Sequence, residues 1–163
     1  MSEPTIIGPA LLDEVWRQAR DSRRLRMNHN FHVREADSSN RMLNAIEPDS
    51  YLRPHRHLEP TKDETIIAVR GSFGAVFFDE QGGITKALII RAGGETMGVN
   101  IPHGLYHTLL SLDSGSVLFE AKAGPYVPLT RSEFAPWAPA EDDPAALAYL
   151  EKLRSLFDYQ LAD

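Results

Sequence analysis

Four side chains in the middle of the chain have the residue types and spacing of a metal site. His55 and His57 alternate, so in an extended strand both imidazoles would point to one face, about 7 Å apart. Glu64 follows after a short polar turn, and His107 comes shortly after a Pro-x-Gly turn. Three imidazoles and one carboxylate suit one divalent transition metal (Fe, Mn, Ni, Co or Zn), with one or two positions left for water or a ligand.

Three further residues are candidates for proton transfer beside that metal. Glu120 and Lys122 share one face of a predicted strand, and their apolar neighbours occupy the other face. If the apolar neighbours pack outward, this acidic and basic pair lines the interior; otherwise it is an exposed ion pair. A lysine near a metal can orient an anionic substrate or transfer a proton. Tyr51 shares the alternation of His55 and completes the candidate set.

Polar residues alternate with apolar ones between residues 24 and 34, which predicts a strand. Its polar face is either solvated surface or the wall of a wet pocket. In a pocket, arginine would bind phosphate with forked donors, and asparagine would bind sugar hydroxyls. The candidate substrate-binding residues are Arg26, Asn28, Asn30 and His32, together with Arg53 on the alternation of the metal ligands. The other two histidines, His29 and His103, are expected to do no chemistry.

The composition limits the classes of protein that these residues can belong to. The chain has 163 residues, no cysteine and six histidines, which excludes disulfides, thiolate zinc sites and iron–sulfur clusters. A formal charge of −6 argues against a nucleic-acid partner. We expect no membrane partner, because no apolar stretch approaches the roughly 20 residues that span a bilayer. The first residues lack a signal-peptide pattern, so we expect a cytoplasmic protein that binds a small molecule.

The elements that must position these residues are mostly short strands. A helix is predicted over 9–22, and a second helix is predicted to start at Asp143-Pro144, where an aspartate cap precedes a proline. Predicted strands cover 24–34, 41–46, 50–57, 64–70, 73–79, 84–90, 95–101, 106–111 and 116–122. Strands at this spacing, without crossover helices, predict one mainly β sandwich or small barrel over 24–123. The single domain, 1–163, ends in a Pro-rich arm and the second helix over 124–163.

Two motifs in this stretch resemble those of the cupin superfamily. His55-x-His57, Glu64 and Gly71 resemble the first motif, and Pro102-x-Gly104-x-x-His107 resembles the second. Asp49 stands where a glycine usually opens the first motif, and Ser111 stands where the second usually ends in Asn. The resemblance implies a double-stranded β-helix, or jelly-roll barrel, with flanking N- and C-terminal helices. Cupins commonly dimerise, so a homodimer is expected.

The carboxylate ligand has two candidates, because the gap from His57 to Glu64 is longer than usual for the motif. Glu59 shares the alternation of the two histidines and is the alternative. Glu64 is preferred, because Pro60 is expected to break the strand and Gly71 keeps its register with Glu64.

A wider set of segments resembles the WbuC family of cupin-fold metalloproteins. The segments are Arg26-x-Asn28-x-Asn30-x-His32, Arg41-Met42-Leu43-Asn44-Ala45, Pro54-His55-Arg56-His57, Phe119-Glu120-Ala121-Lys122-x-Gly124-Pro125-Tyr126 and Phe134-Ala135-Pro136-Trp137-Ala138-Pro139. This resemblance implies a metal-binding cupin and a link to bacterial surface-polysaccharide genes. It therefore favours a ligand such as a sugar or sugar nucleotide.

Several functions fit this site. One is a metal-dependent isomerase or epimerase, in which the metal polarises a carbonyl or hydroxyl of the substrate. An Fe(II)-dependent dioxygenase would use the same ligands. A non-catalytic carbohydrate-binding or sensing domain would use the same pocket without turnover.

Overall fold

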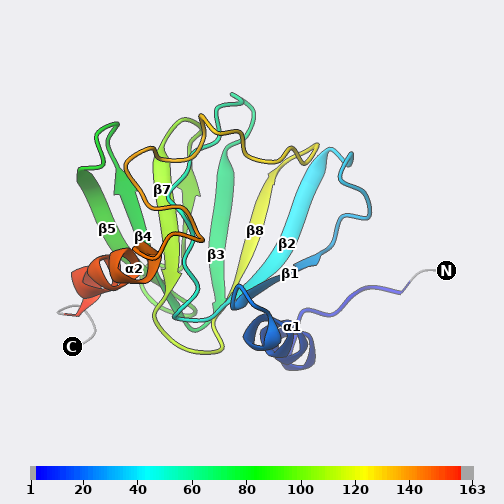
Figure 1. Cartoon of the computed structure of the whole chain (residues 1–163). Helices are drawn as coiled ribbons and strands as arrows, with labels where there is room; N and C mark the ends of the chain where they lie inside the picture. The colour runs from blue at the N-terminus through cyan, green and yellow to red at the C-terminus, as the bar shows by residue number, and fades with distance from the viewer. Residues whose placement is uncertain (1–2, 159–163) are drawn as a thin grey trace.

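The computed structural model describes residues 3–158, which form two antiparallel β-sheets between two helices (Figure 1). The five-stranded sheet has the order β1-β2-β8-β3-β6, and the three-stranded sheet has the order β5-β4-β7. The strands are β1 (Arg26–Asn30), β2 (Ser39–Ile46), β3 (Glu64–Arg70), β4 (Ser72–Phe78), β5 (Ile84–Arg91), β6 (Gly98–Ile101), β7 (Tyr106–Ser111) and β8 (Val117–Ala123). The helices are α1 (Pro9–Asp21) and α2 (Ala146–Arg154), and a 3₁₀ turn, η1 (Ser155–Phe157), follows α2. The predicted mainly β class with flanking helices is confirmed.

Helix α1 covers the outer face of the five-stranded sheet. Its apolar stripe, Leu12, Val15 and Ala19, packs in one cluster with Leu43 of β2 and Val117 of β8. Side chains alternate between the two faces of a strand, so the neighbours of these outward residues point into the sandwich. This places Asn40 and Asn44 of β2, and Glu120 and Lys122 of β8, on the inner face.

Strand β4 is buried on both faces because it lies at the centre of the three-stranded sheet. Phe73 and Phe77 face the other sheet, whereas Val76 and Phe78 pack towards α2 and η1. Gly74 permits the second contact, since a Cβ atom there would lie 2.4 Å from Cε2 of Phe157. The three-stranded sheet is thus fixed between the apolar interior and the C-terminal helix.

The structure corrects three predicted elements. Residues 50–57 are not a strand, because this segment has only isolated bridges at His55 and Pro54 has no N–H to donate to a ladder. Strand β1 is shorter than the predicted 24–34: Leu25, before it, has a positive φ of 54°, and the chain bends after Asn30. Helix α2 begins at Ala146, although the Asp143 carboxylate accepts a hydrogen bond from the backbone N–H of Ala145 just before it.

Strand β6 begins at Gly98 and not at residue 95, so it is shorter than predicted. The other strands agree with their predicted bounds to within two residues, and β3 and β7 have the predicted bounds. The end of the predicted C-terminal region, 159–163, lies outside the described residues. Within residues 3–158, no helix is long and apolar enough to cross a membrane.

Candidate metal centre and its cavity

A short backbone pairing brings His55 beside His107. The N–H of His55 donates to the carbonyl of His107 at 3.0 Å, and the N–H of His107 donates to the carbonyl of His55 at 2.9 Å. The two imidazole centroids are 4.7 Å apart. The segment that fails to form a strand therefore still places its first histidine against β7.

His57 and Glu64 complete a compact group of buried side chains. Glu64, the first residue of β3, has Oε2 3.2 Å from Nε2 of His107 and 3.6 Å from Nε2 of His57. One ring nitrogen from each of the three histidines lies within 4.8 Å of the others. His57, Glu64 and His107 are buried, so this group is a candidate metal centre with Glu64 beside two of its imidazoles.

The backbone orients two of these imidazoles for metal binding. Nδ1 of His55 lies 3.1 Å from the carbonyl oxygen of Arg53, and Nδ1 of His107 lies 2.9 Å from that of Leu105. A carbonyl only accepts, so each Nδ1 carries a proton, and Nε2 is the nitrogen that can bind a metal. Among the described residues, the buried Nε2 of His57 has no hydrogen-bond partner. Oriented imidazoles and an unpartnered buried nitrogen fit a divalent metal ion.

The electrostatics of the group follow from burial and close charges. Burial, helped by the neighbouring His107, lowers the pKa of His55 to about 3, so its ring is neutral at pH 7. Burial alone would raise the pKa of Glu64, but contacts with His107 and His57 and the charge of Lys122 hold it well below its usual range. Neutral imidazoles and an ionised carboxylate are the forms that bind metals.

Glu120 and Lys122 extend this polar group along β8. Lys122 Nζ lies 2.6 Å from Glu120 Oε1 and 3.3 Å from Glu64 Oε1, and Asn44 Nδ2 donates to Glu120 Oε2 at 2.6 Å. Burial, and then the negative charge of Glu64, raise the pKa of Glu120 to about 8. Burial would lower the pKa of Lys122, but the two carboxylates outweigh it and raise it. Of the two alternatives for Glu120 and Lys122, the structure has the inward one and not an exposed ion pair.

A cavity of about 460 Å³ adjoins this group on the inner face of β1, β2 and β8. Lys122 belongs to its wall and also contacts Glu64, so this lysine lies between the cavity and the candidate metal centre, whose four residues are not among the lining residues. Four predicted substrate-binding residues line it: Arg26, Asn28, Asn30 and His32. Of the two alternatives for the polar face of β1, the structure has the wall of a pocket.

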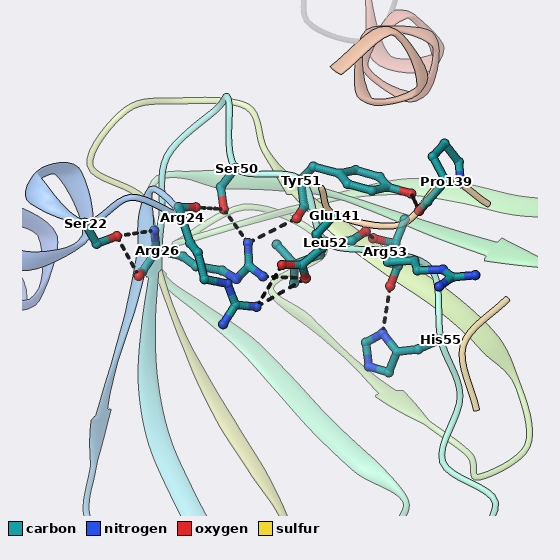
Figure 2. A network of polar contacts seen from close by, with 11 residues as sticks. Ser22, Arg24, Arg26, Ser50, Tyr51, Leu52, Arg53, His55, Pro139 and Glu141 are labelled. Carbon is teal, nitrogen blue, oxygen red and sulfur yellow. Dashed lines mark hydrogen bonds and ion pairs between the residues drawn. The ribbon is translucent and has the colours of Figure 1, made fainter. Parts of the chain in front are cut away.

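Two predicted site residues lie elsewhere (Figure 2). Tyr51 is buried in the core under α2, where its hydroxyl donates to the carbonyl of Pro139 at 3.0 Å, and it is not among the described residues that line the cavity. This position gives its predicted proton-transfer role no support, and the role stays a prediction. Arg53 also lies outside the cavity lining. Its Nη2 donates to the carbonyl of Ala135 at 2.7 Å, and its guanidinium stacks on the Phe134 ring, so its predicted ligand contact gains no support either.

Glu59, the alternative carboxylate ligand, and the histidines His29 and His103 also lie apart from the candidate metal centre. Glu59 is exposed and accepts a hydrogen bond from the Thr61 hydroxyl, which favours Glu64 as the carboxylate ligand. His29 packs against Phe31, with ring centroids 5.2 Å apart, and His103 is exposed beside Asp63. Both histidines therefore lie outside the group of His55, His57 and His107.

Three residues that were not among the predicted site residues also lie on the inner face of the sheet or at the cavity wall. Asn40 and Asn44 lie on the inner face of β2, and Asn40 is fully buried with neither amide atom hydrogen-bonded within residues 3–158. Asn44 alternates with apolar residues on the predicted strand 41–46, which was the available signal, whereas Asn40 lies just before that range. Glu141 contacts Arg24 and Arg26 at the cavity wall, and no local pattern pointed to it.

The sequence was compared with models of protein families and with curated proteins. A family model described as a domain of unknown function (DUF6016) matches residues 7–90, just over half of the chain. The chain belongs to this DUF6016 family. The matched part of this DUF6016 protein includes His55, His57 and Glu64 but not His107. No curated protein matches the chain.

Solved structures with low sequence identity show the same type of fold. A conserved protein of unknown function, SPY1581 from Streptococcus pyogenes, is 8% identical with a TM-score of 0.51, over 78% of this chain and 93% of that one. KdgF from Halomonas sp. is 12% identical with a TM-score of 0.48, over 60% of this chain and 79% of that one. A cupin-2 domain containing protein from Shewanella frigidimarina is 15% identical with a TM-score of 0.45, over 60% and 79%. The fold is cupin-like, with two sandwiched antiparallel sheets and a histidine triad that could hold a metal.

Proposed function

We propose that this protein is a mononuclear metal-binding cupin of the WbuC type. It would bind or act on a small polar metabolite, such as a sugar or sugar nucleotide, in bacterial surface-polysaccharide metabolism. The observation that carries the proposal is the convergence of three histidines and Glu64 beside a polar cavity of about 460 Å³.

The donor set suits a Lewis-acid metal. His55, His57, His107 and Glu64 would hold the ion, which leaves one or two positions for water or a ligand. A metal at this place would polarise a carbonyl or hydroxyl oxygen of the bound ligand.

The chain's own residues supply recognition and a proton-transfer group. The amides of Asn28 and Asn30 are exposed on the cavity wall and offer both donors and acceptors, which match hydroxyl groups. Glu120, held by Asn44 and Lys122, presents a carboxyl group to the same cavity. An isomerisation or epimerisation needs such a group to move a proton, so this class of reaction fits the wall best.

The WbuC assignment and the pathway come from the sequence segments. Pro54-His55-Arg56-His57 carries two of the proposed ligands, and Phe119-Glu120-Ala121-Lys122 carries the two charged residues beside them. The resemblance thus includes candidate-site residues of the loop segment, His55 and His57, and of strand β8, Glu120 and Lys122.

A thermal-shift screen of metal-loaded protein against sugars and sugar nucleotides tests the proposal. A ligand at about a hundred times its Kd adds about 2.7 kcal/mol to the free energy of unfolding, which raises Tm by roughly 5–10 °C for a domain of this size. The matched variants are Asn30→Ala, on the cavity wall, and Asn100→Ala, which lies on β6 and bonds Thr65. The first should lose the shift and the second should keep it. A screen in which no compound raises Tm would contradict the sugar assignment.

A further inference from the structure

One carboxylate from the C-terminal arm forms ion pairs with two arginines of the cavity wall. Glu141 Oε1 lies 2.6 Å from Arg26 Nη2, and Glu141 Oε2 lies 3.0 Å from Arg24 Nη2 (Figure 2). Both arginines line the cavity, and the side chain of Arg26 is only 13% exposed. A buried guanidinium at this position needs an anionic partner, and Glu141 supplies it.

Arg26 is held in place without Glu141. Its Nη1 donates to the Ser50 hydroxyl at 3.2 Å and to the carbonyl of Tyr51 at 3.1 Å. These contacts fix the guanidinium from one side and leave its Nη2 directed at Glu141. If the carboxylate left, the arginine would keep its place and offer preorganised donors to another oxyanion.

Glu141 can leave with little disturbance to the fold. Its side chain is 37% exposed, and it lies in an irregular segment between Pro139, whose carbonyl is fixed by Tyr51, and α2. The turn that precedes α2 is held by Asp143. Rotation of Glu141 towards solvent therefore breaks its contacts with the two arginines but neither of these anchors.

We infer that Arg24 and Arg26 form an oxyanion subsite at the end of the cavity away from Lys122, and that Glu141 is a built-in competitor which the ligand's phosphate or carboxylate displaces. Guanidinium groups bind such oxyanions with charge-assisted hydrogen bonds, and here Nη2 of Arg26 donates to one oxygen of Glu141 while Nη2 of Arg24 donates to both. Displacement also frees this part of the arm from the cavity wall. The inference rests on the proposed function, because it concerns the ligand of the same cavity.

The register of the strands sets the shape of that ligand. Arg26 lies opposite Ile46 of β2, whereas Glu120 lies opposite Met42 of the same strand. Four residues along a strand correspond to about 13 Å. The cavity therefore suits an elongated ligand with hydroxyl groups towards Glu120 and Lys122 and an oxyanion towards Arg26, such as a phosphorylated or carboxylated polyol.

Titration calorimetry with inorganic phosphate and with acetate tests the subsite. Glu141→Gln should bind phosphate about tenfold more tightly than wild type, because one charged competitor is removed. Adding Arg26→Gln to that variant should abolish the gain. The matched control is Glu151→Gln, which removes a carboxylate that pairs with Arg154 outside the cavity lining and should bind as wild type does. A gain with acetate alone would assign the subsite to carboxylates, whereas no gain with either anion would overturn the inference.

Hydrogen exchange on the wild-type chain gives a second test that needs no variant. Phosphate should speed amide exchange over residues 139–145 and slow it over residues 22–27. Unchanged exchange in both segments at saturating phosphate would contradict displacement. Metal content is measured on the same samples, so the oxyanion subsite and the metal centre are tested independently. Metal without a phosphate effect overturns only the subsite, and a phosphate effect without metal overturns only the metal centre.

Discussion

Glu64 Oε2 lies 3.2 Å from Nε2 of His107, although the two residues belong to different sheets. Glu64 opens β3 of the five-stranded sheet, and His107 lies on β7 of the three-stranded sheet. Together with His55 and His57 from the segment between β2 and β3, they form one group of side chains between the two sheets. The candidate metal centre therefore depends on both sheets.

The carboxylate ligand can be identified by paired substitutions. Glu64→Gln should weaken metal binding at least about tenfold, since it removes a charged oxygen donor next to two imidazoles. Glu59→Gln should leave the affinity unchanged, because Glu59 is exposed and bonded to Thr61. Competition with a chromogenic chelator measures both. Equal losses in the two variants would contradict the assignment of Glu64.

Lys122 pairs with the buried, ionised carboxylate of Glu64, so its removal should be costly. Lys122→Met leaves Glu64 without its cation, and we expect a loss of about 3–5 kcal/mol in the free energy of unfolding. Adding Glu64→Gln should recover part of that loss, because the unpaired charge disappears. Urea unfolding of the single and double variants measures the coupling. If Glu64→Gln gives no recovery, the two side chains are not coupled.

The stability of the metal-free protein should fall on acidification through His55. Its pKa is about 3 in the folded chain, mainly because of burial, against an ordinary value of 6.5. Between these pH values only the unfolded chain binds a proton here, so the free energy of unfolding decreases as pH falls from about 6.5 towards 3.

Glu120 acts with the opposite sign, since its raised pKa of about 8 favours the folded state at low pH and loses that contribution as pH rises from about 4.5 through 8. The comparison must therefore be with His55→Gln. After chelation, that variant should lose less stability than wild type between pH 7 and pH 5 in urea titrations. An identical pH dependence would show that His55 is not the cause.

Tyr51 should matter for stability and not for the site. Tyr51→Phe removes the hydrogen bond to Pro139 and should lower the free energy of unfolding by about 1 kcal/mol. Metal content and ligand binding should stay at wild-type values. A lost thermal shift with full metal content would return Tyr51 to the list of residues that contact the ligand.

The sequence predicted the residues of the metal centre better than the element that carries two of them. Strands β3 and β7 follow from clear alternation and turn signals, so Glu64 and His107 could be placed. The segment with His55 and His57 alternates in the same way but has no continuous partner strand, which a local pattern does not reveal. The same alternation predicted that Tyr51 and Arg53 lie at the site, whereas the structure has their side chains bonded to the carbonyls of Pro139 and Ala135.

The features that the sequence did not predict depend mainly on long-range contacts of the C-terminal arm. Glu141 meets Arg24 and Arg26 from the other end of the chain, and Pro139 takes the hydroxyl of Tyr51. These contacts depend on how an irregular segment packs, which neither periodicity nor propensity determines. By contrast, the alternation on β8 limited Glu120 and Lys122 to two positions, inward or exposed, and the packing of α1 against the outer face of the sheet decides for the inward one.

The metal content of protein purified without added metal tests the central claim most directly. Elemental analysis should find close to one transition-metal ion per chain in wild type and almost none in the double variant His55→Ala/His107→Ala. The double variant His29→Ala/His103→Ala, which changes the two histidines outside the site, should retain the wild-type content. If the metal content survives the loss of His55 and His107, these residues do not hold it and the account of the site is wrong.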